Sequence, residues 1–599
     1  MNFFKTFLAG LLAVIVAFFV MGMVWTLVLV GVMASLGSSM SSAKPVTSES
    51  VLRLDLGTIS DSPSQSVEEL FTSLSAGGGS RTTLYKAISA INSATTDDRI
   101  KGLYINLDEY TNVSISSVEE IRAALVEFKE SGKFIVAYNE VYSQGAYYLA
   151  SVADKVYMNP EGEFDWRGLA MQTMFYKGLL DKLGVEPVVI RHGTFKAAVE
   201  PFILNKMSDA NRLQNQTLAN ALWGTITEAV SASRNISVEK LQEWANTLAV
   251  NSPEAALSLG LIDGLLYEDQ VKAELVALIG GETPSEDDAA KEADPKIVAF
   301  ADYVAQLTPA KSLSKNKVAV IYAQGDIVDG TGAMGEVGST SLAAKIVKAR
   351  RDANVKAVVL RVNSPGGSAL ASEVMWRELT LLKEKVPVIV SMGDYAASGG
   401  YYISAPADVI FTNRTTITGS IGVFGLFFNA GDALKNKLGV TVDVVATNAH
   451  GDMGSMFRSP SEAETRYLQH SVEQVYTTFV SHVAAGRNMT PEAVDKIGEG
   501  RVWSGADAVS LGLADDIGGL YDAIAIAADR AGVVEDFRVW EVPDEATGLS
   551  ALLSGTMASV RRAVRSEAMG ETFVHYNNLV RSLQTSGVQA RLPYTFVIE

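Results

Sequence analysis

One stretch of the sequence, residues 386–422, places a serine where it could act as a nucleophile. A β-branched run at Val388–Val390 is followed by glycines and small residues, and Ser398 directly precedes Gly399 and Gly400. This pattern predicts a strand that turns sharply into a short helix at Ser398. The free N–H groups at a helix start favour negative charge developing on a bound carbonyl oxygen. A serine that only caps the helix would give the same local pattern.

Comparison of the chain with itself shows two copies of one domain. Residues 393–413 align without gaps on residues 139–159, an offset of 254 positions. Residues 355–362 echo residues 100–107 at an offset of 255. Self-similarity at a nearly constant offset indicates a duplicated structural unit. The positions at which the copies differ therefore separate the shared fold from any chemistry that one copy carries.

The second copy holds a possible nucleophile that the first copy lacks. Opposite Ser398 the first copy has Gln144, whose amide cannot act as a nucleophile. Opposite the glycine pair Gly366 and Gly367, the first copy has residues 108–113 and no glycine pair. Glycines leave room around a backbone, so this loop could come close to a bound substrate.

A nucleophilic serine needs a base, and the sequence points to a lysine. No histidine lies between Ser398 and His450. A lysine can replace histidine when burial lowers its pKa enough to leave it neutral. Lys196 follows a glycine turn in the first copy, and the second copy has Gly451 at the matching position. Each copy thus supplies one half of a serine/lysine pair, although Lys196 viewed alone is an ordinary surface lysine.

The elements that must position this pair alternate between strands and helices. In the second copy, apolar runs predict strands at 318–322, 357–362 and 388–390, and helical patterns cover 341–351 and 369–385. This alternation predicts an α/β fold with a mainly parallel sheet covered by helices. The polar, acidic stretch 280–295 is expected to link two domains, 46–290 and 291–599.

Composition excludes several classes of function. A net charge of −18 argues against a nucleic-acid partner, because phosphate binding needs a basic face. The chain has no cysteine, and its five histidines are scattered without ligand spacing. We therefore expect no metal site and no cofactor.

The N-terminus, residues 1–45, is predicted to be a membrane anchor. The run Phe7–Leu36 has 30 residues and no charge, whereas about 20 suffice to span a bilayer. A cleavable signal peptide has an apolar region of only about 7–15 residues. Lys5 precedes the run, so the positive-inside rule favours a cytoplasmic N-terminus. We expect a single-pass protein of the bacterial inner membrane whose large body lies on the periplasmic side.

Several motifs make the chain resemble a known family over nearly its whole length. It is similar to the signal peptide peptidase A (protease IV) family in its long, internally duplicated form. The resemblance implies that Ser398 is the nucleophile and Lys196 the general base. It further implies that Gly399 and one of Gly366 or Gly367 donate to the oxyanion, and that Ser420 orients the lysine. The motifs that carry it are Gly193–Phe202, Asn363–Ser368, Asp394–Tyr401, Thr418–Gly422 and Gly500–Gly505.

The same resemblance implies a fold, an assembly and a substrate. The fold would be two tandem copies of a Clp protease/crotonase-like domain, and the assembly a bowl-like homo-oligomer, a tetramer. The activity would be that of a serine endopeptidase that cuts signal-peptide remnants and other apolar peptides through an acyl-enzyme. The sequence leaves open which of Gly366 and Gly367 donates, and whether the serine/lysine pair forms within one chain or between neighbours.

Two rival functions are considered. The first is a membrane-anchored scaffold of the same fold without proteolysis, which the nucleophile-free first copy illustrates. The second is crotonase-like acyl-CoA chemistry, in which the glycine loop polarises a thioester. The presence of both Ser398 and Lys196 argues against the first, and the lack of a basic patch for nucleotide phosphates argues against the second.

Overall fold

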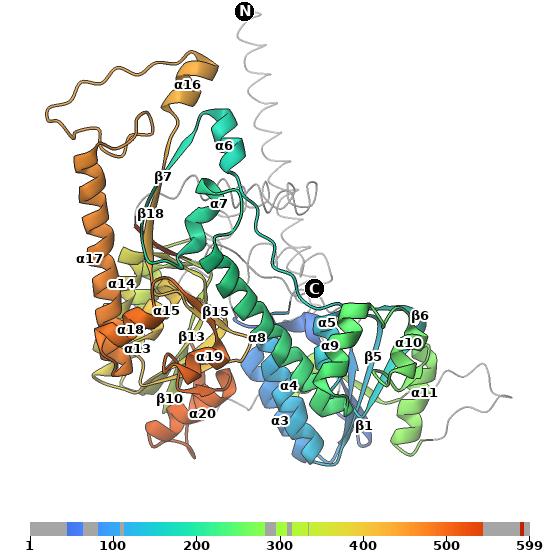
Figure 1. Cartoon of the computed structure of the whole chain (residues 1–599). Helices are drawn as coiled ribbons and strands as arrows, with labels where there is room; N and C mark the ends of the chain where they lie inside the picture. The colour runs from blue at the N-terminus through green and yellow to red at the C-terminus, as the bar shows by residue number, and fades with distance from the viewer. Residues whose placement is uncertain are drawn as a thin grey trace, which may run out of the picture.

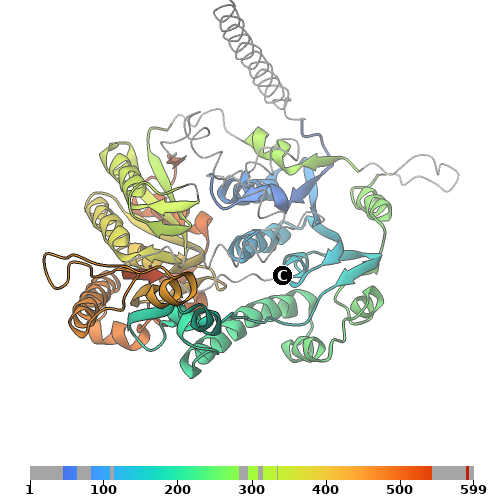
Figure 2. The ribbon, with the colours of Figure 1, turned by 90° about the horizontal axis from the view of Figure 1, so that it is seen from above.

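Two α/β bodies lie side by side in the computed structural model (Figures 1 and 2). The structure describes residues 45–63, 82–107, 113–281, 295–307, 314–333, 335–542 and 588–591. The predicted anchor lies outside these ranges apart from residue 45, and so does most of the predicted linker, residues 282–294. Within the described residues, no helix combines the length and the apolar character needed to cross a membrane.

The first body is a parallel six-stranded sheet with helices on its faces, in the order β8-β6-β5-β4-β1-β9. Its strands are β1 (Ser50–Asp55), β4 (Ile100–Asn106), β5 (Phe134–Tyr142), β6 (Lys155–Phe164), β8 (Gly264–Leu265) and β9 (Ile297–Ala299). Its helices are α3 (Leu84–Thr96), α4 (Ile115–Glu130), α5 (Gln144–Ala150), α8 (Asp209–Arg234), α9 (Val238–Thr247), α10 (Pro253–Ser258), α11 (Glu268–Leu278) and α12 (Phe300–Leu307).

The first body extends past the domain boundary predicted at residue 290. Strand β9 pairs with β1, and helix α12 buries Phe300 and Tyr303 in the core of the first body. Apolar burial therefore assigns residues 295–307 to the first sheet, although they follow the predicted linker.

The second body has a sheet in the order β19-β17-β15-β13-β10-β21, in which β16 also pairs with β15 and β20 pairs with β16. Its central strands are parallel and buried on both faces, as predicted for strands covered by helices. The strands are β10 (Lys317–Gln324), β13 (Val355–Ser364), β15 (Val388–Ala397), β16 (Val409–Thr412), β17 (Ile417–Gly419), β19 (Val502–Ser504), β20 (Asp516–Ile517) and β21 (Arg538–Glu541). The helices are α13 (Ser339–Arg351), α14 (Ala369–Lys383), α15 (Gly399–Ser404), α17 (Glu462–Arg487), α18 (Pro491–Ile497), α19 (Gly505–Ser510) and α20 (Leu520–Arg530).

The two bodies repeat the same local structure, which confirms the duplication. Helices α8 and α17 each have 26 residues, begin after a capping serine and end at a left-handed asparagine. The buried Tyr147 hydroxyl donates to the Leu261 carbonyl, and the buried Tyr401 hydroxyl donates to the Leu513 carbonyl in the same way. A buried hydroxyl needs a hydrogen-bond partner, and the two copies supply it from equivalent positions in their cores.

A third sheet, in the order β12-β11-β14-β22-β18-β7, contains strands from both copies. Its strand β7 (Glu186–His192) belongs to the first copy and pairs antiparallel with β18 (Val423–Asn429) of the second copy, as Figure 1 shows. A piece of the first copy thereby enters the second body. The other strands are β11 (Asp326–Val328), β12 (Glu336–Gly338), β14 (Gly366–Ser368) and β22 (Val588–Arg591), and the helices beside the sheet are α6 (Lys177–Leu183), α7 (Glu200–Ile203) and α16 (Gly431–Leu438).

Candidate active site

Ser398 lies at the predicted turn between strand β15 and helix α15. Its backbone has φ 55° and ψ −114°, a conformation that L-residues rarely adopt and that costs on the order of 1–3 kcal/mol. The Ser398 amide donates to the carbonyl of Gly419 at 2.8 Å, and the Ser398 carbonyl accepts from the Tyr402 amide. These bonds, to β17 and α15, hold the backbone of Ser398, and the residue is fully buried.

Lys196 follows strand β7, which carries it into the second body. The preceding residue, Phe195, donates its amide to the carbonyl of Glu499 at 3.0 Å. Gly500 packs directly on the lysine backbone, since a Cβ at Gly500 would come within 2.7 Å of the Lys196 Cα atom. The motif Gly500–Gly505 therefore has a physical role, because only glycine lets the two chains approach so closely.

The structure brings the predicted serine and lysine together within one chain. Lys196 Nζ lies 2.8 Å from Ser398 Oγ, 3.0 Å from Ser420 Oγ and 3.2 Å from the Ser420 carbonyl oxygen. The lysine side chain is 1% exposed, and this burial lowers the pKa of Lys196 from its ordinary 10.5 to about 7. The amine can therefore be neutral near neutral pH.

Ser420 contacts the Lys196 amine through both its hydroxyl and its carbonyl oxygen. It lies directly after strand β17, has φ 50°, and its hydroxyl donates to the Gly500 carbonyl at 3.4 Å. The Ser420 oxygen is then an acceptor toward Lys196 Nζ, and the Ser420 carbonyl is a second acceptor. Two acceptors direct the two N–H bonds of a neutral amine, which leaves its lone pair for Ser398.

The predicted glycine loop faces the serine turn. Gly366 has φ 99°, and a Cβ at this position would lie 2.7 Å from the Gly399 amide nitrogen. The same Cβ would lie 2.2 Å from the carbonyl oxygen of Ala590 in β22. The Gly366 amide donates to Ser364 Oγ at 3.2 Å. The Ala590 carbonyl oxygen and the Gly399 amide nitrogen therefore both lie close to Gly366.

Strand β22 is an extended segment that lies beside the glycine loop. It pairs antiparallel with β14, where Gly367 faces Ala590, and with β18, where Phe424 faces Gln589. Beside it lies a cavity of about 490 Å³ whose lining includes Leu370, Val475 and Gln589. An extended segment between two strand edges is the geometry of peptide recognition by strand addition.

The first copy has filled the position that corresponds to the nucleophile. Gln144 Oε1 accepts from the amides of Arg167 at 3.0 Å and Gly168 at 2.7 Å. Its Nε2 donates to the Gly168 carbonyl at 3.2 Å. This side chain links α5 to the segment at Arg167 and Gly168, at the position where the second copy has its serine.

A buried ionic cluster joins the two bodies next to the serine strand, and the sequence analysis missed it. Arg361 of β13 is 1% exposed and pairs with Asp61 at 2.6 Å and Glu120 at 2.8 Å, both from the first copy. Asp394, on the strand that ends at Ser398, accepts from the Ser116 amide at 2.9 Å. The available signal was the arginine in the otherwise apolar run 357–362, since a buried arginine requires acidic partners.

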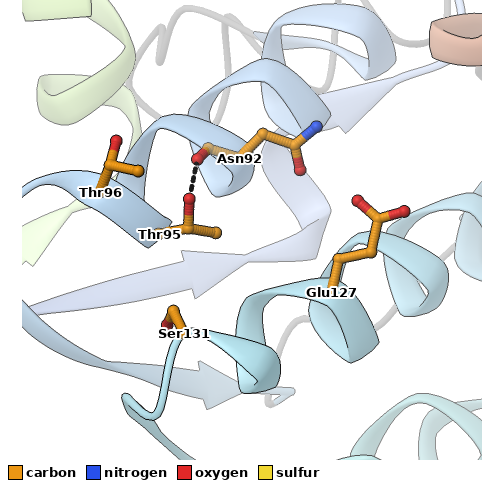
Figure 3. Close-up of a pocket in the computed structure, with 5 residues that line it drawn as sticks. All are labelled: Asn92, Thr95, Thr96, Glu127 and Ser131. Carbon is orange, nitrogen blue, oxygen red and sulfur yellow. Dashed lines mark hydrogen bonds between the residues drawn. The ribbon is translucent and has the colours of Figure 1, made fainter.

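A separate cavity of about 550 Å³ lies on the first body, between α3 and α4 (Figure 3). Its lining residues are polar: Asn92, Thr95, Thr96, Glu127 and Ser131. The Thr95 hydroxyl donates to the Asn92 carbonyl within it. The cavity contains neither Lys196 nor Ser398, so it is separate from the buried pair at the boundary of the two copies.

Comparison with known proteins agrees with this geometry. The model for peptidase family S49 matches residues 127–280 and again residues 380–534, one match for each copy. Protease 4 of Salmonella typhi is 38% identical over 89% of this chain and 86% of its own length. Protease 4 of Haemophilus influenzae is 37% identical over 79% of this chain and 78% of its own length. The chloroplastic serine protease SPPA of Arabidopsis thaliana is 32% identical over 83% of this chain and 72% of its own length.

These matches decide between the peptidase and its two rivals, the scaffold and the acyl-CoA enzyme. They cover both copies and most of the chain. The chain belongs to peptidase family S49, and it is a serine protease.

Proposed function

We propose that the chain is a membrane-anchored endopeptidase that uses Ser398 as nucleophile and Lys196 as general base. The observation that carries this proposal is the 2.8 Å contact between Lys196 Nζ and Ser398 Oγ in a fully buried site. A base must lie within about 2.6–3.2 Å of the proton it removes, and its pKa should lie near the working pH. Both conditions hold for Lys196, whose pKa is lowered to about 7 by burial.

The reaction begins with neutral Lys196. Its lone pair takes the Ser398 proton while its N–H bonds point to the two oxygens of Ser420. Ser398 Oγ attacks the peptide carbonyl, and the Gly399 amide together with an amide of the Gly366–Gly367 loop stabilises the oxyanion. The charged lysine then protonates the leaving amine, and a water molecule hydrolyses the ester bond to Ser398.

The proposed substrates are signal-peptide remnants and other apolar peptides, bound as an extended strand. Strand β22 supports this mode, because it already lies between the edges of β14 and β18 beside the glycine loop. Main-chain bonds to both edges hold any sequence, so side chains in the adjoining cavity must supply selectivity. An anchor at residues 1–45 would keep the body on the periplasmic side of the inner membrane, close to peptides released there.

A synthetic signal peptide should be cleaved with a kcat/KM on the order of 10–100-fold higher than a peptide of equal length whose apolar core is replaced by Ser, Thr and Gln. Burial of a Leu or Val side chain stabilises a complex by about 1.5–3 kcal/mol, so loss of one or two such contacts gives this ratio. The measurement is steady-state hydrolysis of both peptides by the full chain in detergent. Equal kcat/KM values would refute the substrate class and leave the peptidase chemistry standing.

Gly366→Ala should lower kcat on the order of 10²–10³-fold. The φ of 99° disfavours alanine, and its Cβ would press on the Gly399 amide and so displace an oxyanion donor. The matched control is Gly330→Ala, which also replaces a glycine at positive φ but in open space. If Gly366→Ala and the control both have the wild-type kcat, the glycine loop does not take part in catalysis.

A further inference from the structure

The first turn of helix α8 holds the segment that follows Lys196. Glu200, four residues after the lysine, is buried. Its carboxylate accepts from the Ser208 amide at 3.1 Å, from the Ser208 hydroxyl at 2.5 Å and from Asn211 Nδ2 at 2.8 Å. Ser208 also caps the helix. A buried carboxylate needs such donors, and the positive end of a helix favours its charge. Glu200 is therefore fixed to the start of α8.

Gln214, further along α8, holds the residue that precedes the lysine. Its Nε2 atom donates to the Phe195 carbonyl and to Asn211 Oδ1, both at 3.2 Å. Its Oε1 atom accepts from the Val502 amide of β19 at 3.4 Å. The strand β19 pairs with β17, which ends directly before Ser420. One buried amide side chain thus ties the lysine segment to the strand pair beside Ser420.

The second body holds Phe195 as well. The Phe195 amide donates to the Glu499 carbonyl at 3.0 Å, and the Arg501 guanidinium lies 5.0 Å from the centre of the Phe195 ring. Glu499 Oε2 also accepts from the Thr194 amide at 3.2 Å. The amide, the carbonyl and the ring of Phe195 are all in contact with partners. The backbone that enters Lys196 is therefore fixed in place.

Further along, α8 packs beside the serine strand. Leu218 and Leu222 follow Gln214 by four and eight residues, so the three side chains lie on one face of the helix. Both leucines are buried in one apolar cluster with Ala397, the residue before Ser398. Helix α8, which runs between the two bodies in Figure 1, thus packs beside both halves of the dyad.

The second copy shows that this kind of helix does not require a buried glutamine. Its equivalent helix, α17, also begins after a capping serine, Ser461. The sixth residue after that serine is the exposed Tyr467, whereas α8 has the buried Gln214 at this place. The second copy has Gly451 in place of Lys196. The buried glutamine therefore occurs in the copy that carries the lysine.

We propose that helix α8 sets the distance between Lys196 and Ser398, and that Gln214 is the positioning residue for the lysine. This inference rests on the proposed function of the two residues. A helix suits the role because its rise of about 1.5 Å per residue fixes the spacing between successive turns. Precise spacing matters, since a misplacement of about 1 Å can cost on the order of 10²-fold in rate. Gln214 acts through the backbone of Phe195.

Gln214→Met tests the positioning role, because methionine keeps the length of the side chain and removes its hydrogen bonds. We expect kcat for a fluorogenic apolar peptide to fall on the order of 10–100-fold, with KM changed less than about twofold. The inflection of kcat/KM against pH should also rise from about 7 by about one pH unit or more. A displaced lysine admits water, and hydration favours its ammonium form.

Gln216→Met is the matched control for Gln214→Met. Gln216 is exposed on the same helix and donates to Asn220 at 2.9 Å. The control should keep the wild-type kcat and the wild-type inflection. An unshifted inflection in Gln214→Met, whatever its kcat, would mean that Gln214 only stabilises the fold. Equal changes in both variants would lead to the same conclusion.

The Lys196→Met background separates this inference from the proposed function. A residue that acts through Lys196 has nothing left to position once the amine is gone. Gln214→Met should therefore change the residual rate of Lys196→Met less than about twofold. A further fall as large as in the wild-type background would overturn the positioning role. Wild-type kcat/KM in Lys196→Met itself would instead refute the proposed base.

Substitutions of Leu218 test the contact of α8 with the serine strand. Leu218→Ala removes packing beside Ala397 and should lower kcat about tenfold, because the strand before Ser398 can then shift. Leu218→Met conserves the volume and should keep kcat within about twofold of the wild type. Both are compared at a temperature at which circular dichroism shows them folded. Wild-type kcat in Leu218→Ala would show that α8 does not set the position of Ser398.

Discussion

Ser398→Ala is expected to lower kcat/KM for an apolar peptide on the order of 10⁴-fold or more, since loss of a nucleophile removes the covalent pathway. Binding of the peptide should change little, because an extended peptide is held through its main chain and not through the Ser398 hydroxyl. The measurement is hydrolysis of a fluorogenic apolar peptide by the full chain. The expected residual rate is that of a site which binds the peptide without attacking it.

A neighbouring buried serine provides the control for Ser398. Ser404 lies in the same helix, is fully buried, and donates to the Gly400 carbonyl at 2.7 Å. Ser404→Ala should cost about 0.5–1.5 kcal/mol of stability and leave kcat unchanged. Wild-type turnover by Ser398→Ala would disprove the nucleophile. Equal loss in both variants, with lowered thermal stability, would indicate a folding defect in place of a chemical one.

Lys196→Met is expected to lower kcat/KM on the order of 10³-fold or more while the protein stays folded. Methionine fills the buried channel without a charge to desolvate, so the substitution removes the base and keeps the packing. Lys182→Met, on the exposed face of α6, is the matched control and should retain wild-type activity. Wild-type kcat/KM in Lys196→Met would show that another group removes the Ser398 proton.

The pH profile provides an independent test of the lysine. Only the neutral amine accepts a proton, so kcat/KM of the wild type should rise about tenfold per pH unit below the Lys196 pKa of about 7 and level off above it. The direction follows from burial, which disfavours the ammonium form. The measurement is kcat/KM from pH 5 to 10. An inflection near 10.5, the ordinary value for lysine, would mean that the working site does not bury Lys196.

The geometry of the site depends on how the two copies pack against each other, whereas a site within a single domain would not depend on such packing. Lys196 and Ser398 come from different copies, and the Arg361 cluster together with Asp394 fixes the first body against the strand that ends at Ser398. Loss of one partner from a buried ion pair typically costs about 3–5 kcal/mol. Substitutions in this cluster are therefore expected to shift Ser398 relative to Lys196, although the cluster itself does not contact the substrate.

Local patterns in the sequence were sufficient for much of the fold. Alternating apolar runs predicted the parallel strands β10, β13 and β15 and the helices α13 and α14, and all five are confirmed. The strand-to-helix turn at Ser398 was predictable because glycine and small-residue spacing reports on backbone shape. Burial, in contrast, assigned β9 and α12 to the first body, because the packing of Phe300 and Tyr303 depends on distant partners.

The sequence by itself determined that one copy carries a serine and a glycine loop and that the other carries a lysine. This was possible because the two copies can be aligned with each other, and the alignment shows where their residues differ. Only the tertiary structure decided that these groups meet within one chain. Strand β7 crosses into the second body, and packing against Gly500 and Ser420 buries the lysine. A 2.8 Å contact across 202 positions and a pKa near 7 both arise from long-range packing and desolvation, which local sequence does not encode.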